Sequence, residues 1–338
     1  MADIKAIKDL ALHAAKKTVP VEFASQTVAD VNEALRSELR ELCGTYDLYR
    51  RNKYDLFEIM QETMDAVVPA QVMQVIANFA EVKNYANGQK PSFKLKKGKI
   101  RARKFATRAT ASGVYETFRL DTDVIEVPTF TIGDAAYIDF ERFLSGDEDW
   151  ADYMEALMDG ILHRIYTEIF NELMNGAALL GGNNKTEANS YDKKDLLDLI
   201  KIVKAYGEPV IVASAEYIAS MGPDDVTTNS AAVTGKGVYA DEDINNIHKY
   251  GRPLSFRGTQ LIELPVSYED ETNTKEVFGG NFAFVFPTNG EKVVKVAFEG
   301  QTIVDDWTNR DRSMEIQAYK KMGTAIVTGN NWGMITIK

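Results

Sequence analysis

A single helical pattern, running from residue 145 to residue 176, sets the strongest limit on how this chain folds. Ser145-Gly146-Asp147-Glu148 fits a capping box, in which the serine bonds the third amide and the glutamate reaches back to the cap. Apolar residues then recur on one face, namely Trp150, Met154, Leu157, Ile161, Ile165, Ile169 and Leu173. Asn175-Gly176 is a stop signal. The pattern predicts one helix of about 29 residues, a rigid spine roughly 43 Å long at ~1.5 Å per residue.

The residues before this helix predict several shorter helices. The start of the chain has the pattern of an amphipathic helix rather than a secretory signal, and Thr27 is a candidate cap for a second helix. A third apolar run ends where Pro69 interrupts it, and a fourth follows at 72–79. The pattern favours a helical N-terminal arm over residues 1–88 rather than a compact domain.

Residues 90–108 concentrate positive charge in an otherwise acidic chain. This segment holds nine basic residues and no acid, whereas the 338-residue chain has a net charge of −11. The nine are Lys90, Lys94, Lys96, Lys97, Lys99, Arg101, Arg103, Lys104 and Arg108. Asn87-Gly88 signals a turn, and partial alternation from Ser92 to Leu120 predicts a two-stranded hairpin. A lone hairpin buries too little surface to be stable, so we expect it to lie on another subunit.

Three interpretations of this basic hairpin are open: a solvated loop, a nucleic-acid contact, and an arm that docks on an acidic neighbour. Only Phe93 and Phe105 interleave with the charges, which is weak support for base stacking. The negative net charge also argues against a dedicated nucleic-acid binder. We favour the docking arm, because two copies of such a chain are complementary in charge and salt keeps the contacts local.

The remaining strands and helices are predicted from shorter patterns. A strand is expected at 124–132, where Pro128 favours an edge position. Beyond residue 181 the sequence becomes α/β, with helices expected at 195–206, 215–221 and 241–250, and strands at 209–213, 260–264 and 282–286. Residues 288–291 are expected to form a hairpin turn into a strand at 293–298, and further strands are expected at 314–319, 323–327 and 335–337.

The sequence offers few residues for catalysis or metal binding. Asp159 and His163 could share one helix face, but the repeated Glu-x-x-His pairs of a di-metal bundle are missing. Residues 235–240 match Gly-x-Gly-x-x-Ala without a preceding strand, which favours a loop. We therefore predict no catalytic residue, no cofactor and no metal. The single cysteine, Cys43, is expected to be a buried small hydrophobe. No apolar run reaches the ~18–20 residues of a membrane helix.

The order of these parts resembles the Hong Kong 97-type major capsid proteins of tailed bacteriophages. After the helical N-terminal arm at 1–88, residues 89–123 resemble the E-loop hairpin of that family, and 124–180 its P domain with a long spine helix at 147–175. Residues 181–292 resemble the α/β A domain, and 293–338 a return to the P domain. The resemblance implies an α+β fold with a Hong Kong 97-like arrangement.

The resemblance also implies a function, that of a major capsid protein. Such a chain self-assembles through pentamers and hexamers into an icosahedral shell, which encloses double-stranded DNA without sequence-specific binding. The expected location is the virion capsid, assembled in the host cytoplasm. Scaffold, portal and decoration proteins are candidate partners, and no membrane is expected. The residues expected to dock the hairpin on a neighbouring subunit are Lys94, Lys96, Lys97, Lys99, Arg101, Arg103, Lys104 and Arg108.

Two other functions are kept as alternatives. An encapsulin-like nanocompartment shell protein would share the fold. A small α/β enzyme built on residues 181–290 belongs to a different class, and it would need a convergent polar triad that the sequence does not display.

Overall fold

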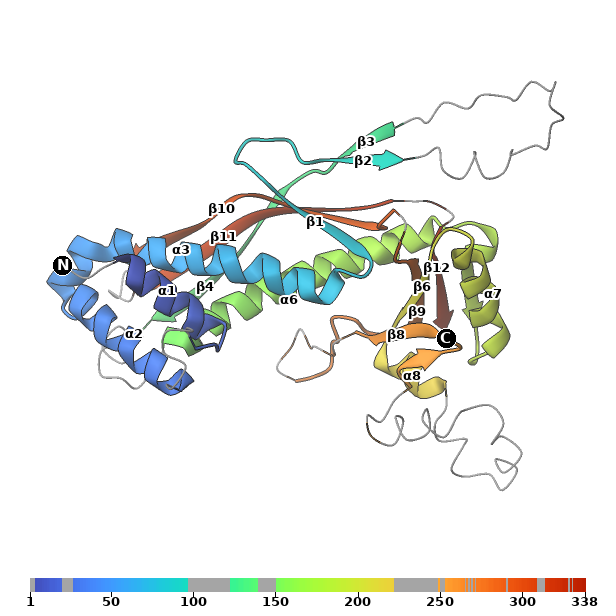
Figure 1. Ribbon diagram of the computed structural model, residues 1–338, viewed down its shortest axis with the longest axis horizontal. Helices are drawn as coiled ribbons and strands as arrows, with labels where there is room; N and C mark the ends of the chain where they lie inside the picture. Colours follow the sequence, from blue (N-terminus) through green and yellow to red (C-terminus); the bar gives the residue numbers. More distant parts are fainter. Residues whose placement is uncertain are drawn as a thin grey trace, which may run out of the picture.

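The computed structural model describes residues 4–19, 27–96, 122–138, 150–221, 249, 253–264, 266, 268, 270, 272–289, 291–308, 314–327, 329 and 331–338. These residues form helices and sheets arranged along one long axis (Figure 1). Three N-terminal helices lie at one end and a six-stranded sheet lies at the other. A long helix and a four-stranded sheet run between them. The expected α+β class is confirmed.

The three N-terminal helices are α1 (Ile4–Ala15), α2 (Val28–Cys43) and α3 (Tyr46–Ile76). The cap predicted for α2 is confirmed: the Asp30 N–H donates to the Thr27 side chain, and the Thr27 N–H donates to the Asp30 carboxylate. The break predicted at Pro69 is wrong, because α3 continues through it. Val67 and Val68 beside the proline are 1% exposed, so packing outweighs the hydrogen bond that proline cannot make.

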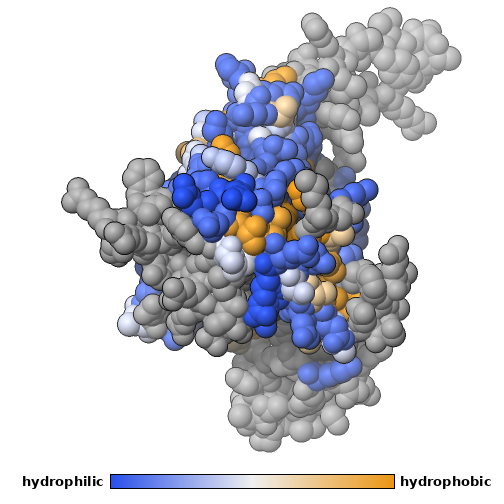
Figure 2. All heavy atoms as spheres, turned by 90° about the vertical axis from the view of Figure 1, so that its left-hand side faces the viewer, coloured by the Kyte–Doolittle hydropathy of each residue, from blue (hydrophilic) through white to orange (hydrophobic). Residues whose placement is uncertain are grey.

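These helices pack on one another and on the rest of the described structure. The elements that they contact include α6 (Trp150–Ala178) and β10 (Val294–Thr308). Lys53 of α3 donates to Asp306 at 2.9 Å, and the Thr302 N–H donates to Asp65 of α3 at 3.0 Å. The Lys320 ammonium also donates to Asp65. Viewed from the end where these three helices lie, the surface of the described residues is largely hydrophilic with small hydrophobic patches (Figure 2).

A four-stranded sheet with the order β1-β10-β11-β4 forms the middle of the molecule. Its other strands are β1 (Ala80–Tyr85), β11 (Met314–Ile326) and β4 (Phe130–Ile138). β1 runs parallel to β10, and the other neighbours are antiparallel. β1 was not predicted from the sequence, and β11 is one continuous strand where two were predicted.

The predicted long helix is confirmed: within the described residues α6 spans Trp150–Ala178 and ends three residues later than expected. The predicted capping box lies outside the described residues. Gly176 does not end the helix; a Cβ at this position would lie 2.8 Å from Ile326 Cγ2 of β11. At Gly160 a Cβ would lie 1.9 Å from the Asp134 carboxylate of β4. The two glycines thus lie on the side of α6 that faces the sheet, where a larger residue would require Asp134 or Ile326 to move.

The six-stranded sheet has the order β5-β12-β9-β6-β8-β7. Its strands are β5 (Lys185–Ala188), β12 (Gly333–Ile337), β9 (Asn281–Pro287), β6 (Pro209–Ala213), β8 (Thr259–Glu263) and β7 (Ser255–Phe256). A short 3-10 turn (Gly182–Asn184) precedes β5, and the helices α7 (Lys193–Lys204) and α8 (Ala215–Ser220) confirm two of the three predictions in this region. The third, at 241–250, lies outside the described residues except for Lys249.

Two connections of this sheet differ from expectation. Residues 288–291 were expected to be a hairpin turn, but β9 and β10 lie in different sheets, so this segment crosses between them. The strand at 335–337 was expected to join the closing strands, but β12 pairs with β5 and β9. Met334 and Ile335 are each 2% exposed and belong to different hydrophobic clusters. Because β12 is apolar on both faces, it fits the interior of the six-stranded sheet better than an edge of the four-stranded sheet.

Cys43 is buried, as expected, with 1% of its surface exposed. Burial raises the pKa of its thiol to about 11, and the negative charge of Asp55 adds to this effect. Because a thiol reacts as the thiolate, we expect labelling by a disulfide reagent at pH 8 to be at least ~100-fold slower in the folded protein than in urea. Fast labelling of the native protein would show that the end of α2 opens readily.

Among the described residues, no helix combines the length and apolarity of a bilayer span.

Candidate docking hairpin and its root

The predicted basic hairpin begins and ends in a two-stranded antiparallel sheet. The strands are β2 (Ser92–Lys96) and β3 (Thr122–Glu126), and Lys96 pairs with Thr122. The hairpin is therefore confirmed at its base, and the rest of the predicted hairpin lies outside the described residues. The strand expected at 124–132 is divided, because residues 127–129 separate β3 from β4. Figure 1 shows β2 and β3 extending away from the four-stranded sheet.

The structure describes two of the eight predicted docking residues. Lys94 is exposed on β2, and Lys96 ends that strand. The other six lie outside the described residues: Lys97, Lys99, Arg101, Arg103, Lys104 and Arg108. They belong to the segment that connects Lys96 to Thr122, two residues whose backbones are paired. This segment therefore starts and finishes at the same end of the sheet, and the docking role of its residues remains a prediction.

A small apolar cluster attaches the hairpin to the four-stranded sheet. Phe93 of β2 is 0% exposed and packs with Val127 and with Ala297 of β10. The ring of Tyr85 meets Phe93 edge-on at 6.1 Å, and the Tyr85 hydroxyl donates to the Ser92 carbonyl at 2.5 Å. Alternation along β2 thus buries Phe93 and exposes Lys94. We call residues 85–93 and 126–129 the hairpin root.

One carboxylate contacts both chain segments of the hairpin root. Glu299 of β10 is 8% exposed. One of its oxygens accepts the Gly88 N–H at 3.0 Å, and the other accepts the Thr129 hydroxyl at 2.6 Å. The bond from Thr129, followed by that from Gly88, holds the pKa of this carboxyl below its usual value. The charged form is therefore the one that binds the root.

Sequence reasoning found the basic charge but missed the groups that position it. Phe93 was noted only as an aromatic residue among charges, and Glu299 was not noted at all. The one local signal near Glu299 is Gly300, which has a φ of +71° beside the irregularity in the pairing of β10 with β11. The partners Gly88, Thr129 and Glu299 are far apart in the sequence, so only the fold brings them together.

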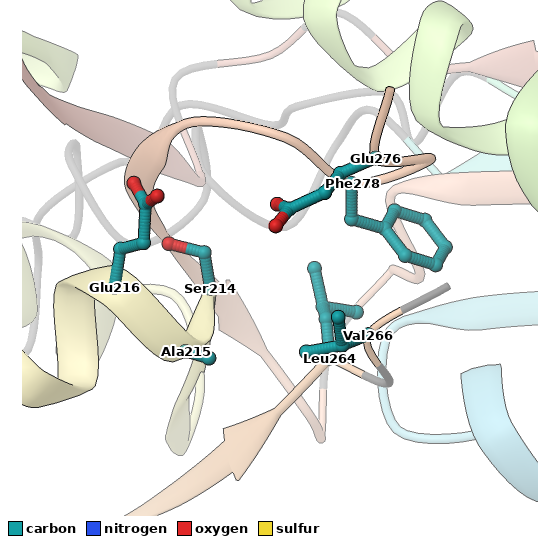
Figure 3. Close-up of a pocket in the computed structure, with 7 residues that line it drawn as sticks. All are labelled: Ser214, Ala215, Glu216, Leu264, Val266, Glu276 and Phe278. Carbon is teal, nitrogen blue, oxygen red and sulfur yellow. The ribbon is translucent and has the colours of Figure 1, made fainter. Parts of the chain in front are cut away.

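The α/β part contains a small pocket that bears on the enzyme alternative. In Figure 3, Ser214 and Glu216 at the start of α8 lie opposite Glu276, with Leu264, Val266 and Phe278 beside them. The Ser214 hydroxyl accepts the Tyr217 N–H at 3.2 Å and donates to the Phe282 carbonyl at 3.3 Å. Ser214 therefore caps the helix and anchors β9. Since no histidine or lysine is among the described residues that line the pocket, this geometry does not support a nucleophilic site.

The other candidates for chemistry gain no support. Asp159 and His163 each take part in an interaction, and no metal-binding group of His, Cys, Asp and Glu occurs among the described residues. The Gly-x-Gly-x-x-Ala pattern at 235–240 lies outside the part of the chain that the structure describes.

Comparison with known proteins identifies a family. The family model described as "SPbeta prophage-derived putative capsid protein YonB" matches residues 3–336. No curated protein sequence matches the chain.

Similar solved structures include the asymmetric unit of the bacteriophage PhiM1 mature capsid (9% identity, TM-score 0.49, 77% of this chain and 86% of that one). A Microbacterium phage Oxtober96 structure has 10% identity and a TM-score of 0.49, over 78% of this chain and 90% of that one. The holo-SrpI encapsulin complex from Synechococcus elongatus PCC 7942 has 13% identity and a TM-score of 0.44, over 75% and 84%. These identities and TM-scores are too low to indicate function, so the family assignment rests on the family-model match alone.

Proposed function

Because this chain belongs to the family described as SPbeta prophage-derived putative capsid protein YonB, we infer that it is the major capsid protein of a tailed-phage virion. The observation that carries this conclusion is the extent of the match, which reaches from the residue before α1 into β12. A subunit of a closed shell is a structural component, and we propose that it has no enzymatic activity.

The layout of the described elements supports a Hong Kong 97-like arrangement. The long helix α6 on the four-stranded sheet suits a spine domain, and the six-stranded sheet with α7 and α8 suits an axial domain. The domain boundaries at 88, 123, 180 and 292 stay a proposal, and β12 joins the proposed axial part although it follows residue 292. We propose assembly through pentamers and hexamers in the host cytoplasm.

We propose that the basic hairpin docks on an acidic surface of a neighbouring subunit. The hairpin segment carries nine positive charges in a chain of net charge −11, so the rest of the chain has a net charge of −20. Lys94 is exposed, and the charged segment starts and ends at one end of the β2–β3 sheet. Repetition of one charge-complementary contact around a closed ring stabilises an assembly that a single contact could not hold.

The test is to express the chain alone and examine it by mass photometry and electron microscopy at near-physiological salt. We expect rings of subunits or closed hollow particles. A persistent 37.7 kDa monomer, alone and when co-expressed with a candidate scaffold protein, would contradict the assignment. The nanocompartment alternative predicts the same shell without packaged DNA, and no observation on the described residues favours it.

A further inference from the structure

We propose that Glu299 is a positioning residue that fixes the basic hairpin to the body of the subunit. The consequence for assembly rests on the docking function proposed above, whereas the attachment itself does not. The hairpin joins the body through two connections, residues 86–91 between β1 and β2 and residues 127–129 between β3 and β4. Glu299 accepts a hydrogen bond from each of them. One side chain on the central strand β10 therefore holds both.

The neighbouring glycines show how closely each connection lies on the sheet. A Cβ at Gly323 of β11 would lie 2.4 Å from the Pro128 carbonyl oxygen and 2.8 Å from Val127 Cγ1, so only glycine leaves room for the second connection. At Gly300 a Cβ would lie 3.4 Å from Asn87 of the first connection, and the φ of +71° favours glycine. The second connection thus lies tightly on the sheet at Gly323, whereas at Gly300 there is space for a Cβ and only the positive φ favours glycine.

The burial and hydrogen bonding of Glu299 are those of an attachment point rather than of a solvated surface carboxylate. Both of its oxygens are used, and hydrogen bonds to a buried ionised group are stronger than those between neutral groups. Lys321, its partner across the β10–β11 pair, further favours the charged form. The apolar cluster of Phe93, Val127 and Ala297 also joins the two segments of the root, and Glu299 adds a charged hydrogen-bond acceptor for each of them.

Two substitutions separate this role from simple packing. Glu299→Met keeps the length of the side chain and loses both acceptors. Glu299→Gln can keep both hydrogen bonds, one of them reversed, because its carbonyl accepts the Gly88 N–H while its amide donates to the Thr129 hydroxyl oxygen. We therefore expect Glu299→Met to release the root and Glu299→Gln to restore most of the attachment. Glu216→Gln, on the exposed first turn of α8, is the matched control.

The measurement is hydrogen exchange by mass spectrometry on the full-length chain, with all variants compared in the same assembly state. For Glu299→Met we expect exchange in peptides covering 86–96 and 122–129 to be about tenfold faster or more, since two bonds to a charged group are lost. Exchange in β9 should not change. Unchanged exchange at the root, or faster exchange throughout the chain, would overturn the proposal. A wild-type chain that never assembles would contradict the capsid function and not this attachment.

Discussion

Reversing the charge of Lys96, Lys97, Arg101 and Arg103 to glutamate is expected to leave a folded subunit that no longer closes into shells. The substitutions change the net charge from −11 to −19 and turn the basic segment into one that repels an acidic neighbour. Placing like charges opposite each other at a subunit contact makes binding less favourable by about several kcal/mol. Electron microscopy of the purified variant should show single subunits or small open assemblies instead of closed particles.

The matched control reverses four lysines on α7, which are Lys193, Lys194, Lys201 and Lys204. All four are exposed, and their reversal changes the net charge by the same amount. Thermal unfolding should be similar for the two variants, and the α7 variant should still form particles. In the wild type, 1 M salt should weaken assembly, since the screening length falls from ~8 Å to ~3 Å. Normal particles from the hairpin variant would exclude the docking role.

Removing both carboxylates around Lys295 is expected to lower the stability of the subunit strongly. Lys295 of β10 is 0% exposed, and its ammonium lies 2.5 Å from Glu81 of β1 and 2.5 Å from Glu291. In the double variant Glu81→Gln, Glu291→Gln, the ammonium stays buried with no opposite charge beside it. We expect the free energy of unfolding to fall by about 3 kcal/mol or more.

Lys295→Met provides the contrasting variant. It removes the buried charge and keeps an unbranched apolar side chain, while Glu81 retains Lys83 as a partner at 2.6 Å. Both freed carboxylates are about one-third exposed, so water can solvate them. We expect a loss of no more than ~1 kcal/mol, as is often found when a buried ion pair is replaced by apolar packing. Urea unfolding measures both values, and an equal loss in the two variants would contradict this account.

The sequence predicted those parts of the fold whose signals are local. The face of α6, the Thr27 cap and the apolar strand β6 all depend on residues close together in the chain. The predictions of helix boundaries were wrong where contacts between residues far apart in the sequence determine the structure. Pro69 is accommodated inside α3 because the valines around it are buried, and α6 passes Gly176 because that glycine lies against β11.

Strand partners were harder to predict than strands. β1 has the partly polar sequence Ala-Glu-Val-Lys-Asn-Tyr, and its pairing with β10 involves residues at the far end of the chain. The sheet to which β12 belongs also depends on its partner strands, because its apolar sequence predicts a strand but not the neighbours with which it pairs. For the candidate site, the basic hairpin could be predicted from its charge. Glu299 could not, since its role depends on Gly88 and Thr129 lying beside it.

The most direct test of the central claim is a cryo-electron microscopy reconstruction of the assembled wild-type particle. We expect a closed shell in which residues 97–121 of each subunit contact an acidic surface of an adjacent copy, with the root held on Glu299. A closed shell whose basic hairpins contact only solvent or packaged DNA would contradict the docking role. The absence of any closed shell would contradict the capsid function itself.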